Sequence, residues 1–142
     1  MARVLIIEDD PLISRMYQKV FQFEGFEVDM ARDGQEGLDR LKANKPTIIL
    51  LDIMMPIKTG VDVLIEIKAD EEYKNIPVIM LTNLSGDEDV DKALSLGAVK
   101  YIVKSQNKPK QVVDQVVEIL AATTREEIPN AALSRKLRKQ EN

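Results

Sequence analysis

Residues 47–52 read Thr47-Ile48-Ile49-Leu50-Leu51-Asp52, an apolar run that stops at a carboxylate. An apolar run without polar alternation is typical of a central strand in a parallel sheet, because helices cover both faces of such a strand. The sequence therefore predicts a buried strand at 47–51 whose end presents Asp52.

Similar short runs lie on both sides of this one and alternate with stretches of helical periodicity. We expect the other strands at 4–7, 26–30, 76–81 and 99–103, with a helix after each strand. This alternation predicts an α/β fold, a doubly wound five-stranded parallel sheet with helices on both faces.

The helices carry start signals and apolar stripes that predict their buried faces. Asp10 and Pro11 are expected to begin the first helix, as N-cap and first helical residue. Its inward stripe is expected to be Leu12, Ile13, Met16, Val20 and Phe23. We also expect Val61, Leu64 and Ile65 to face inward on the third helix, and Val90, Ala93 and Leu94 on the fourth. The last helix should begin at Pro109 and bury Val112, Val113, Val116, Val117 and Leu120.

Composition excludes several classes of function. The 142 residues carry 20 Lys and Arg against 24 Asp and Glu, and contain neither Cys nor His. Disulfides, thiolate or imidazole metal sites and Cys nucleophiles are therefore excluded. No apolar run approaches the ~20 residues of a membrane span. The apolar run at 4–7 is too short for the core of a signal peptide, and no small-residue cleavage site follows it. We expect a cytoplasmic protein without membrane contact, and the net charge of −4 argues against direct nucleic-acid binding.

The length favours a single domain. We place it at 1–121, followed by a charged segment at 122–142 that includes a basic cluster at 135–139. That segment is expected to be a solvated tail, disordered in one reading, or an extension of the last helix. A partner-binding or dimer-forming role is the alternative.

Polar side chains follow four of the five strands. Glu8 and Asp9 follow the first strand, Asp52 the third, Thr82 the fourth and Lys104 the fifth. In a parallel sheet these ends lie at one edge, where ligands bind. Carboxylates crowded together repel each other, which either protonation or a divalent cation relieves. Oxygen ligands without His or Cys select a hard ion, so Mg²⁺ is the favoured reading.

These residue types suit phosphoryl transfer onto a carboxylate. Asp52 is the candidate nucleophile, Lys104 supplies positive charge, and Thr82 can donate a hydrogen bond to a phosphoryl oxygen. Each residue alone has an ordinary explanation, as a loop acid, a surface lysine or a turn former. The joint pattern at one edge favours the functional interpretation.

The sequence resembles the receiver domain of two-component response regulators. The matching segments are 4–10, 50–56 with Gly60, 81–82 and 97–104, and the resemblance covers about residues 3–120. It implies the strand order 2-1-3-4-5 and a signalling switch in a phosphorelay. The phosphoryl donor would be a phosphohistidine on a sensor histidine kinase or a histidine phosphotransfer protein. Such a domain is not an enzyme beyond its own Mg²⁺-dependent phosphorylation and dephosphorylation.

The resemblance also implies residue roles. Asp52 would be the phospho-acceptor, and Asp9, Asp52 and the main-chain carbonyl of Met54 would hold Mg²⁺, with Glu8 acting through water. Thr82 and Tyr101 would form the switch pair. The surface of the fourth helix, fifth strand and fifth helix would then change its contacts with a downstream protein, and a phosphorylation-dependent homodimer is a further expectation.

The chain departs from the family pattern at three positions. Ser105 follows Lys104 where a proline is usual, Asn83 follows Thr82 where a smaller residue is usual, and Thr59 stands where an acid is common. Met54, Asn83 and Leu84 occupy positions that flank the phosphoryl group. The apolar Met54 and Leu84 are hypothesised to exclude water and lengthen the life of the acyl phosphate.

Three alternatives remain at this stage. A pseudo-receiver would act as a protein-binding scaffold without phosphorylation. A flavin module or a dehalogenase-type phosphatase would need other residues after the first strand. The sequence leaves open the cognate kinase, the signal, the output, and whether the chain is a stand-alone regulator or part of a longer one.

Overall fold

The structure, a computed structural model, describes residues 2–123. Its five strands form one all-parallel sheet in the order β2-β1-β3-β4-β5, which confirms the predicted fold class and strand order. The strands are β1 (Arg3–Ile7), β2 (Glu27–Ala31), β3 (Ile48–Leu51), β4 (Val78–Thr82) and β5 (Lys100–Val103). The observed strand ends differ from the predicted ones by at most two residues.

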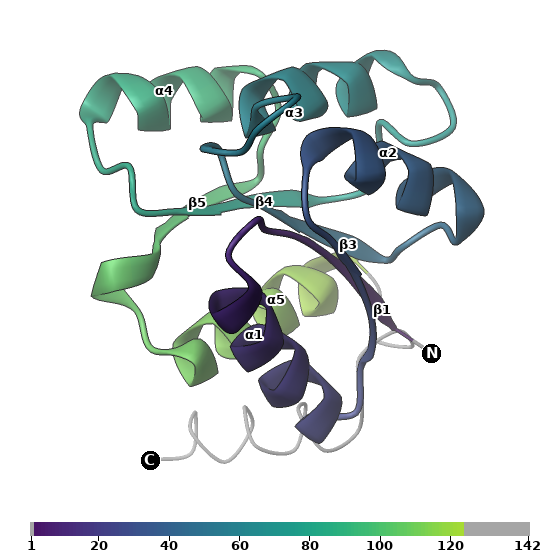
Figure 1. Ribbon diagram of the computed structural model, residues 1–142, viewed down its shortest axis with the longest axis vertical. Helices are drawn as coiled ribbons and strands as arrows, with labels where there is room; N and C mark the ends of the chain where they lie inside the picture. Colours follow the sequence, from purple (N-terminus) through teal and green to yellow (C-terminus); the bar gives the residue numbers. More distant parts are fainter. Residues whose placement is uncertain (1, 124–142) are drawn as a thin grey trace.

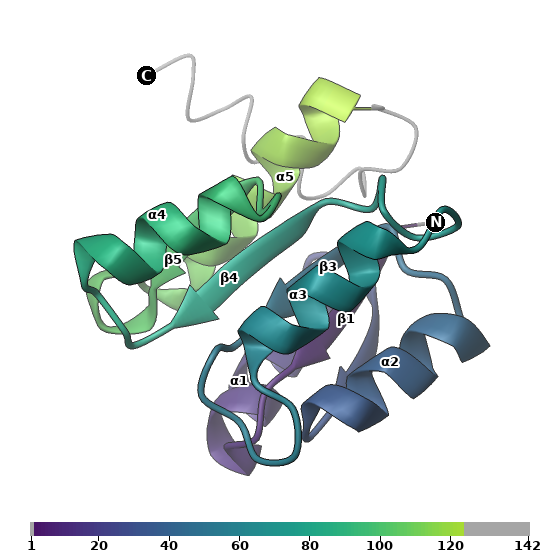
Figure 2. The ribbon, with the colours of Figure 1, turned by 90° about the horizontal axis from the view of Figure 1, so that it is seen from above.

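Helices cover both faces of the sheet (Figure 1, Figure 2). On one face lie α1 (Pro11–Phe23) and α5 (Pro109–Thr123), and on the other lie α2 (Gly34–Ala43), α3 (Gly60–Ala69) and α4 (Asp87–Ser95). A single 3₁₀ turn, η1 (Lys104–Gln106), connects β5 to the loop before α5.

The sheet separates two apolar cores, because successive side chains of a strand point to opposite faces. Ile48 and Leu50 of β3 belong to the core under α1 and α5, while Ile49 and Leu51 belong to the core under α2 and α3. All four are buried, as predicted for a central strand. The five predicted apolar positions of α5 are also all buried.

The predicted inward stripe of α1 is largely wrong. The buried side chains of this helix are Ser14, Tyr17 and Phe21, whereas three of the expected ones are exposed, namely Leu12 (79%), Met16 (41%) and Phe23 (87%). Apolar residues occur on more than one side of this helix, so periodicity alone cannot choose its buried face. The large rings decide it: Phe21 packs edge-on against Phe26 with ring centroids 5.4 Å apart.

The predictions for two side chains on the opposite layer also fail. Ile65 of α3 and Leu94 of α4 are 46% and 44% exposed. Leu64 and Ala93 are buried as predicted, Val61 and Val90 are partly buried, and Val63 and Ile67 complete the core from α3. The sheet accepts only one narrow face of each helix, and Ile65 and Leu94 lie beyond it.

The start of α1 places the segment that follows β1. The side chain of Asp10 accepts hydrogen bonds from the main-chain N–H groups of Leu12 (2.9 Å) and Ile13 (3.2 Å), as predicted for an N-cap.

None of the described helices is long and apolar enough to span a membrane. Residues 124–142, which hold most of the predicted tail, lie outside the described residues.

Candidate functional site

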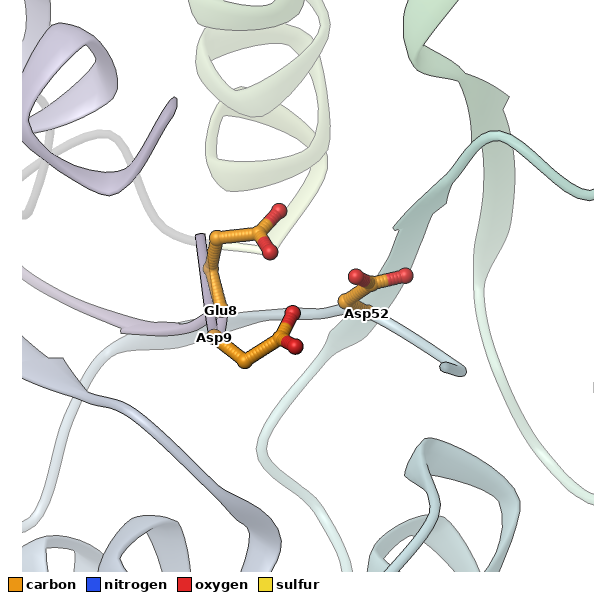
Figure 3. Close-up of side chains that lie close together, drawn as sticks. All are labelled: Glu8, Asp9 and Asp52. Carbon is orange, nitrogen blue, oxygen red and sulfur yellow. The ribbon is translucent and has the colours of Figure 1, made fainter. Parts of the chain in front are cut away.

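Three carboxylates lie together at the carboxyl edge of the sheet, the edge at which its strands end (Figure 3). Glu8, Asp9 and Asp52 each offer a carboxylate oxygen, and these oxygens all lie within 4.8 Å of one another. Main-chain hydrogen bonds that extend the pairing of the strands hold Glu8 and Asp52 in place. The N–H of Glu8 donates to the carbonyl of Ala31, and that of Asp52 to the carbonyl of Ile7, both at 3.0 Å. The structure thus brings together the three acids that the sequence places after strands.

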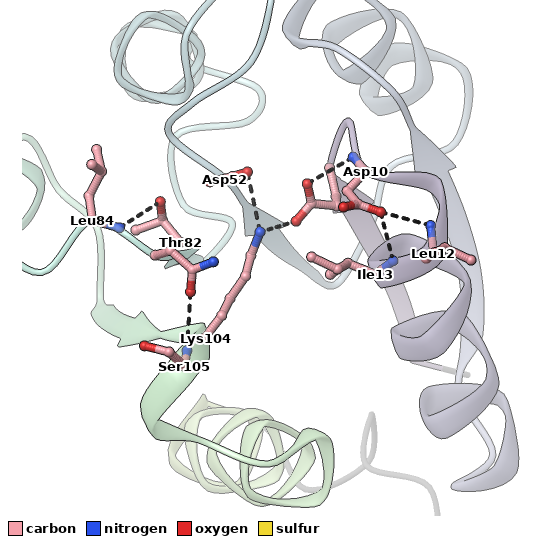
Figure 4. A network of polar contacts seen from close by, with 10 residues as sticks. Asp10, Leu12, Ile13, Asp52, Thr82, Leu84, Lys104 and Ser105 are labelled. Atoms are coloured by element: carbon pink, nitrogen blue, oxygen red, sulfur yellow. Dashed lines mark hydrogen bonds and ion pairs between the residues drawn. The ribbon is translucent and has the colours of Figure 1, made fainter.

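Lys104 reaches this cluster from the end of β5 (Figure 4). Its ammonium donates to Glu8 and, at 3.3 Å, to Oδ2 of Asp52. All three side chains are less than a tenth exposed. Glu8 and Asp52 are buried, whereas Asp9 is exposed at the mouth of the cluster. One ammonium against these three carboxylates leaves an excess of negative charge, and a small divalent cation would balance it.

The environment of Glu8 is unfavourable for its charge. Burial raises the pKa of Glu8 to about 7, partly opposed by the bonds from Lys104 and from the main-chain N–H of Asp10, and reinforced by the charge of Asp52. The bond from Asp10 is 3.1 Å long. Glu8 is therefore the carboxylate that can take up a proton near neutral pH when no cation is bound.

The β3–α3 loop folds back closely over Asp52. The N–H of Gly60 donates to the carbonyl of Ile53 at 2.8 Å, and a Cβ added at Gly60 would lie 2.0 Å from the main-chain oxygen of Asp52. Only glycine permits this approach. Thr59 and Asp62 close a capping box at the start of α3, so Thr59 has a structural role where the family pattern has an acid.

The same loop borders an open hollow beside Asp9. Met54 lies on its wall together with Asp9, and the side chain of Met54 is 63% exposed. The hollow is lined by Asp9, Ile53, Met54, Met55, Pro56 and Thr59.

Ile57 in this loop has a backbone conformation that the sequence gives no sign of. Its φ is +70°, and the N–H of Lys58 donates to the carbonyl of Pro56 at 2.8 Å, which closes a three-residue turn around Ile57. A β-branched residue is a poor choice for positive φ, and turns of this kind are strained. A glycine or asparagine at this position would have revealed the turn.

Thr82 and Tyr101, the expected switch pair, meet at the β4–α4 loop. Thr82 is 1% exposed at the end of β4, and its Oγ1 accepts from the N–H of Leu84 at 3.4 Å. The hydroxyl of Tyr101 donates to the carbonyl of Leu84 at 2.7 Å. Burial, and next the charges of Asp89 and Asp52, raise the pKa of Tyr101, so its hydroxyl remains a donor. Leu84 thus contacts both members of the pair through its main chain.

Two of the three departures from the family pattern contact each other. The main-chain N–H of Ser105 donates to Oδ1 of Asn83 at 3.1 Å (Figure 4). The Lys104–Ser105 peptide bond is trans, as are all the described peptide bonds. Sequence reasoning singled out both residues but not their contact, because they lie 22 positions apart.

The fold and this edge together define a class of protein: a doubly wound α/β domain with an acidic site and a buried lysine at the carboxyl ends of its strands. The family model for the response regulator receiver domain matches residues 4–131. The chain belongs to this family. It is a receiver domain of two-component response regulators, proteins that signal through phosphorylation.

Similar proteins and similar solved structures agree with the assignment of the chain to the receiver-domain family. The chemotaxis protein CheY of Treponema pallidum is 36% identical over 121 residues, which cover 83% of this chain and 82% of that protein. The DNA-binding response regulator MtrA of Mycolicibacterium smegmatis is 35% identical over 114 residues, 80% of this chain and 48% of that protein. The chain thus spans about half the length of MtrA. The solved Mn²⁺-bound form of response regulator Rcp1 has a TM-score of 0.72 at 30% identity, covering 84% of this chain and 91% of that one.

Proposed function

We propose that the chain accepts a phosphoryl group from a phosphohistidine of a partner protein onto Asp52 and thereby switches its contacts with a downstream protein. The main observation in support of this proposal is the position of Asp52. Its carboxylate is nearly buried, lies 3.3 Å from the ammonium of Lys104, and stands with Glu8 and Asp9 at the carboxyl edge.

The donor set fits a hard divalent cation. The carboxylates of Glu8, Asp9 and Asp52 converge at the carboxyl edge, and the chain has no His or Cys that could add an imidazole or thiolate ligand. Mg²⁺ takes one or two carboxylates and retains several waters. Asp9 and Asp52 would bind it directly together with the main-chain carbonyl of Met54, and Glu8 would act through water. When bound, Mg²⁺ would neutralise charge on the transferring phosphoryl group. The Mn²⁺-bound state of Rcp1 is consistent with such an ion.

In the proposed reaction a carboxylate oxygen of Asp52 attacks phosphorus in line with the donor imidazole nitrogen. A P–O bond to Asp52 forms, the P–N bond breaks, and the electron pair leaves with the imidazole. Such a loose transition state needs a positioned nucleophile and positive charge around the phosphoryl oxygens. Lys104 is placed to supply that charge from the side of β5.

The switch would act through the β4–α4 loop. A phosphoryl group adds about −1.5 to −2 charge and three acceptor oxygens, and Thr82 is the nearest hydroxyl on β4. If the Thr82 hydroxyl turns to the phosphoryl group, it gives up its contact with the N–H of Leu84, whose carbonyl binds Tyr101. The expected output surface is α4, β5 and α5, with a downstream protein or a second copy as its partner.

Met54 and Leu84 would govern the lifetime of the acyl phosphate. Both are apolar, and they come from the two loops that border Asp52. Water attack requires a path between these loops, which apolar side chains disfavour. Replacement of both by polar residues is expected to accelerate dephosphorylation, and an unchanged lifetime would reject this part of the proposal.

The decisive experiment is phosphorylation by a small donor. Incubation with acetyl phosphate and Mg²⁺ should add the mass of one phosphoryl group to the chain, and the Asp52→Asn variant should gain none. Beryllium fluoride with Mg²⁺ should perturb the main-chain resonances of Thr82 and Tyr101 only when Asp52 is intact. No mass gain and no response would instead favour a pseudo-receiver that acts as a binding scaffold.

A further inference from the structure

Asn83 and Ser105 lie directly beyond the end of the β4–β5 pairing. The last paired residues are Thr82 of β4 and Val103 of β5. After these residues the two strands diverge into the β4–α4 loop and η1, and the main-chain hydrogen bonds between them end. The Asn83 side chain extends the connection by one further bond, the 3.1 Å contact with the N–H of Ser105.

This hydrogen bond depends on both residue types. A proline at 105 has no N–H to donate, and an alanine at 83 has no side-chain acceptor. The chain therefore carries a matched pair, an acceptor on one loop and a free main-chain donor on the other. Neither residue alone would make the contact.

The bond holds the turn that begins with Lys104. On its far side this turn is held by Asn107, whose N–H donates to the carbonyl of Lys104 at 3.3 Å and whose side chain donates to the carbonyl of Val103 at 3.0 Å. On its near side the Asn83 bond ties Ser105 to the β4–α4 loop. The main chain of Lys104 is thus held between two fixed points.

We propose that Asn83 is a positioning residue for Lys104. By binding the Ser105 N–H it holds the Lys104 main chain so that the long, flexible side chain delivers its ammonium to Asp52. The inference rests on the proposed function for its kinetic consequence, but the contact itself can be tested without phosphorylation.

The expected effect is moderate, because both partners are exposed and water can replace either one. A hydrogen bond of this kind changes a rate or an affinity by about three- to tenfold. Asn83→Ala should therefore slow phosphorylation of Asp52 by acetyl phosphate by about that factor. Ser105→Ala keeps the main-chain N–H and should match the unaltered chain.

The experiment compares Asn83→Ala with and without a Lys104→Ala change, by intact-mass time courses at saturating Mg²⁺. If Asn83 acts through Lys104, its loss should have no further effect once Lys104 is absent. A general disturbance of the loop would slow both backgrounds equally and would overturn the proposal. An unchanged rate in Asn83→Ala alone would overturn it as well.

Hydrogen exchange separates this inference from the proposed function. The Ser105 amide proton should exchange at least threefold faster in Asn83→Ala, whereas that of Ile102 within β5 should not change. This measurement remains valid if Asp52 is never phosphorylated, since it reports only the contact. Equal exchange at Ser105 in both proteins would reject the contact and with it the positioning role.

Discussion

The two edges of the sheet carry the same kind of charge cluster in different surroundings. At the edge where strands begin, the amino edge, Arg3 pairs with Glu27 at 2.8 Å and with Asp29 at 3.2 Å, and its side chain is 29% exposed. At the carboxyl edge, Lys104 pairs with Glu8 and Asp52, and its side chain is 9% exposed. Each cluster has one cation and two paired carboxylates. The carboxyl-edge cluster also includes a third, exposed carboxylate, Asp9. Burial of Lys104, Glu8 and Asp52 holds their charges at high cost, whereas solvent screens the charges at the amino edge.

The backbone shows the same contrast. Gly25 (φ +93°) and Gly97 (φ +109°) lie in the turns that lead into β2 and β5 at the amino edge, where glycine adopts such angles without strain. At the carboxyl edge the residue with positive φ is Ile57, for which this angle is unfavourable. Among the described residues, the one non-glycine residue with positive φ thus lies at the edge that carries the site, as expected where function and stability compete.

A methyl group at Gly60 should have the largest effect. It would overlap the main-chain oxygen of Asp52 at 2.0 Å, so the loop or the acceptor must move. We expect Gly60→Ala to lower the free energy of unfolding by about 3 kcal/mol or more. A displaced Asp52 should also slow phosphorylation by about 100-fold. Chemical denaturation and intact-mass kinetics measure the two effects.

Gly97→Ala is the matched change at the amino edge. The nearest atoms to its Cβ would be side-chain methylenes of Lys68, at 3.2 Å, rather than main chain, so the main cost is the strain of a positive φ, about 1–2 kcal/mol. Phosphorylation should proceed at the original rate. If both glycine variants lost phosphorylation equally, the distinction between the edges would fail.

Replacement of the cation by alanine should destabilise the protein more at the carboxyl edge than at the amino edge. Lys104→Ala leaves Glu8 and Asp52 facing each other in a largely buried position, so we expect a loss of about 2 kcal/mol at pH 8 without Mg²⁺. Arg3→Ala should cost less than about 1 kcal/mol, because its partners remain hydrated. Urea denaturation of both variants provides the measurement. Equal losses would mean that burial does not distinguish the clusters.

The pKa of Glu8 predicts a dependence of stability on pH. Burial raises the pKa of Glu8 to about 7 in the folded protein, above the value of 4.5 for a free glutamate, so between these pH values the folded protein binds more protons than the unfolded chain. Stability should therefore fall as pH rises from 4.5 to 7 in the absence of Mg²⁺, by about 2–3 kcal/mol. Glu8→Gln should remove this fall, and Glu27→Gln at the amino edge should retain it. A slope that survives in Glu8→Gln would assign the proton to another group.

The sequence predicted the sheet well because four of the five strands are mainly apolar runs followed by a polar side chain. The exception is β2, in which Glu27 and Asp29 alternate with apolar residues. The sequence also predicted which acids converge, since parallel strands bring their ends to one edge. It could not select the buried face of α1, where apolar residues surround the helix and only the packing of Tyr17 and Phe21 decides. Nor could it reveal the Asn83–Ser105 contact, which joins two loops 22 positions apart. The turn at Ile57 is local, but an isoleucine at positive φ gives no sign of it in the sequence.

The turn at Ile57 gives the prediction with the smallest expected effect. Here the substitution should stabilise the protein, whereas the variants above should destabilise it. The Ile57 side chain is 77% exposed, so its replacement loses little packing, whereas asparagine tolerates positive φ. Ile57→Asn should therefore raise the free energy of unfolding by about 0.5–1 kcal/mol. The control is Ile65→Asn on α3, where an exposed isoleucine has ordinary helical geometry and the same change should stabilise nothing. If Ile57→Asn destabilises the protein while Ile65→Asn is neutral, the isoleucine makes a stabilising contact and the strain at the carboxyl edge is not the controlling factor.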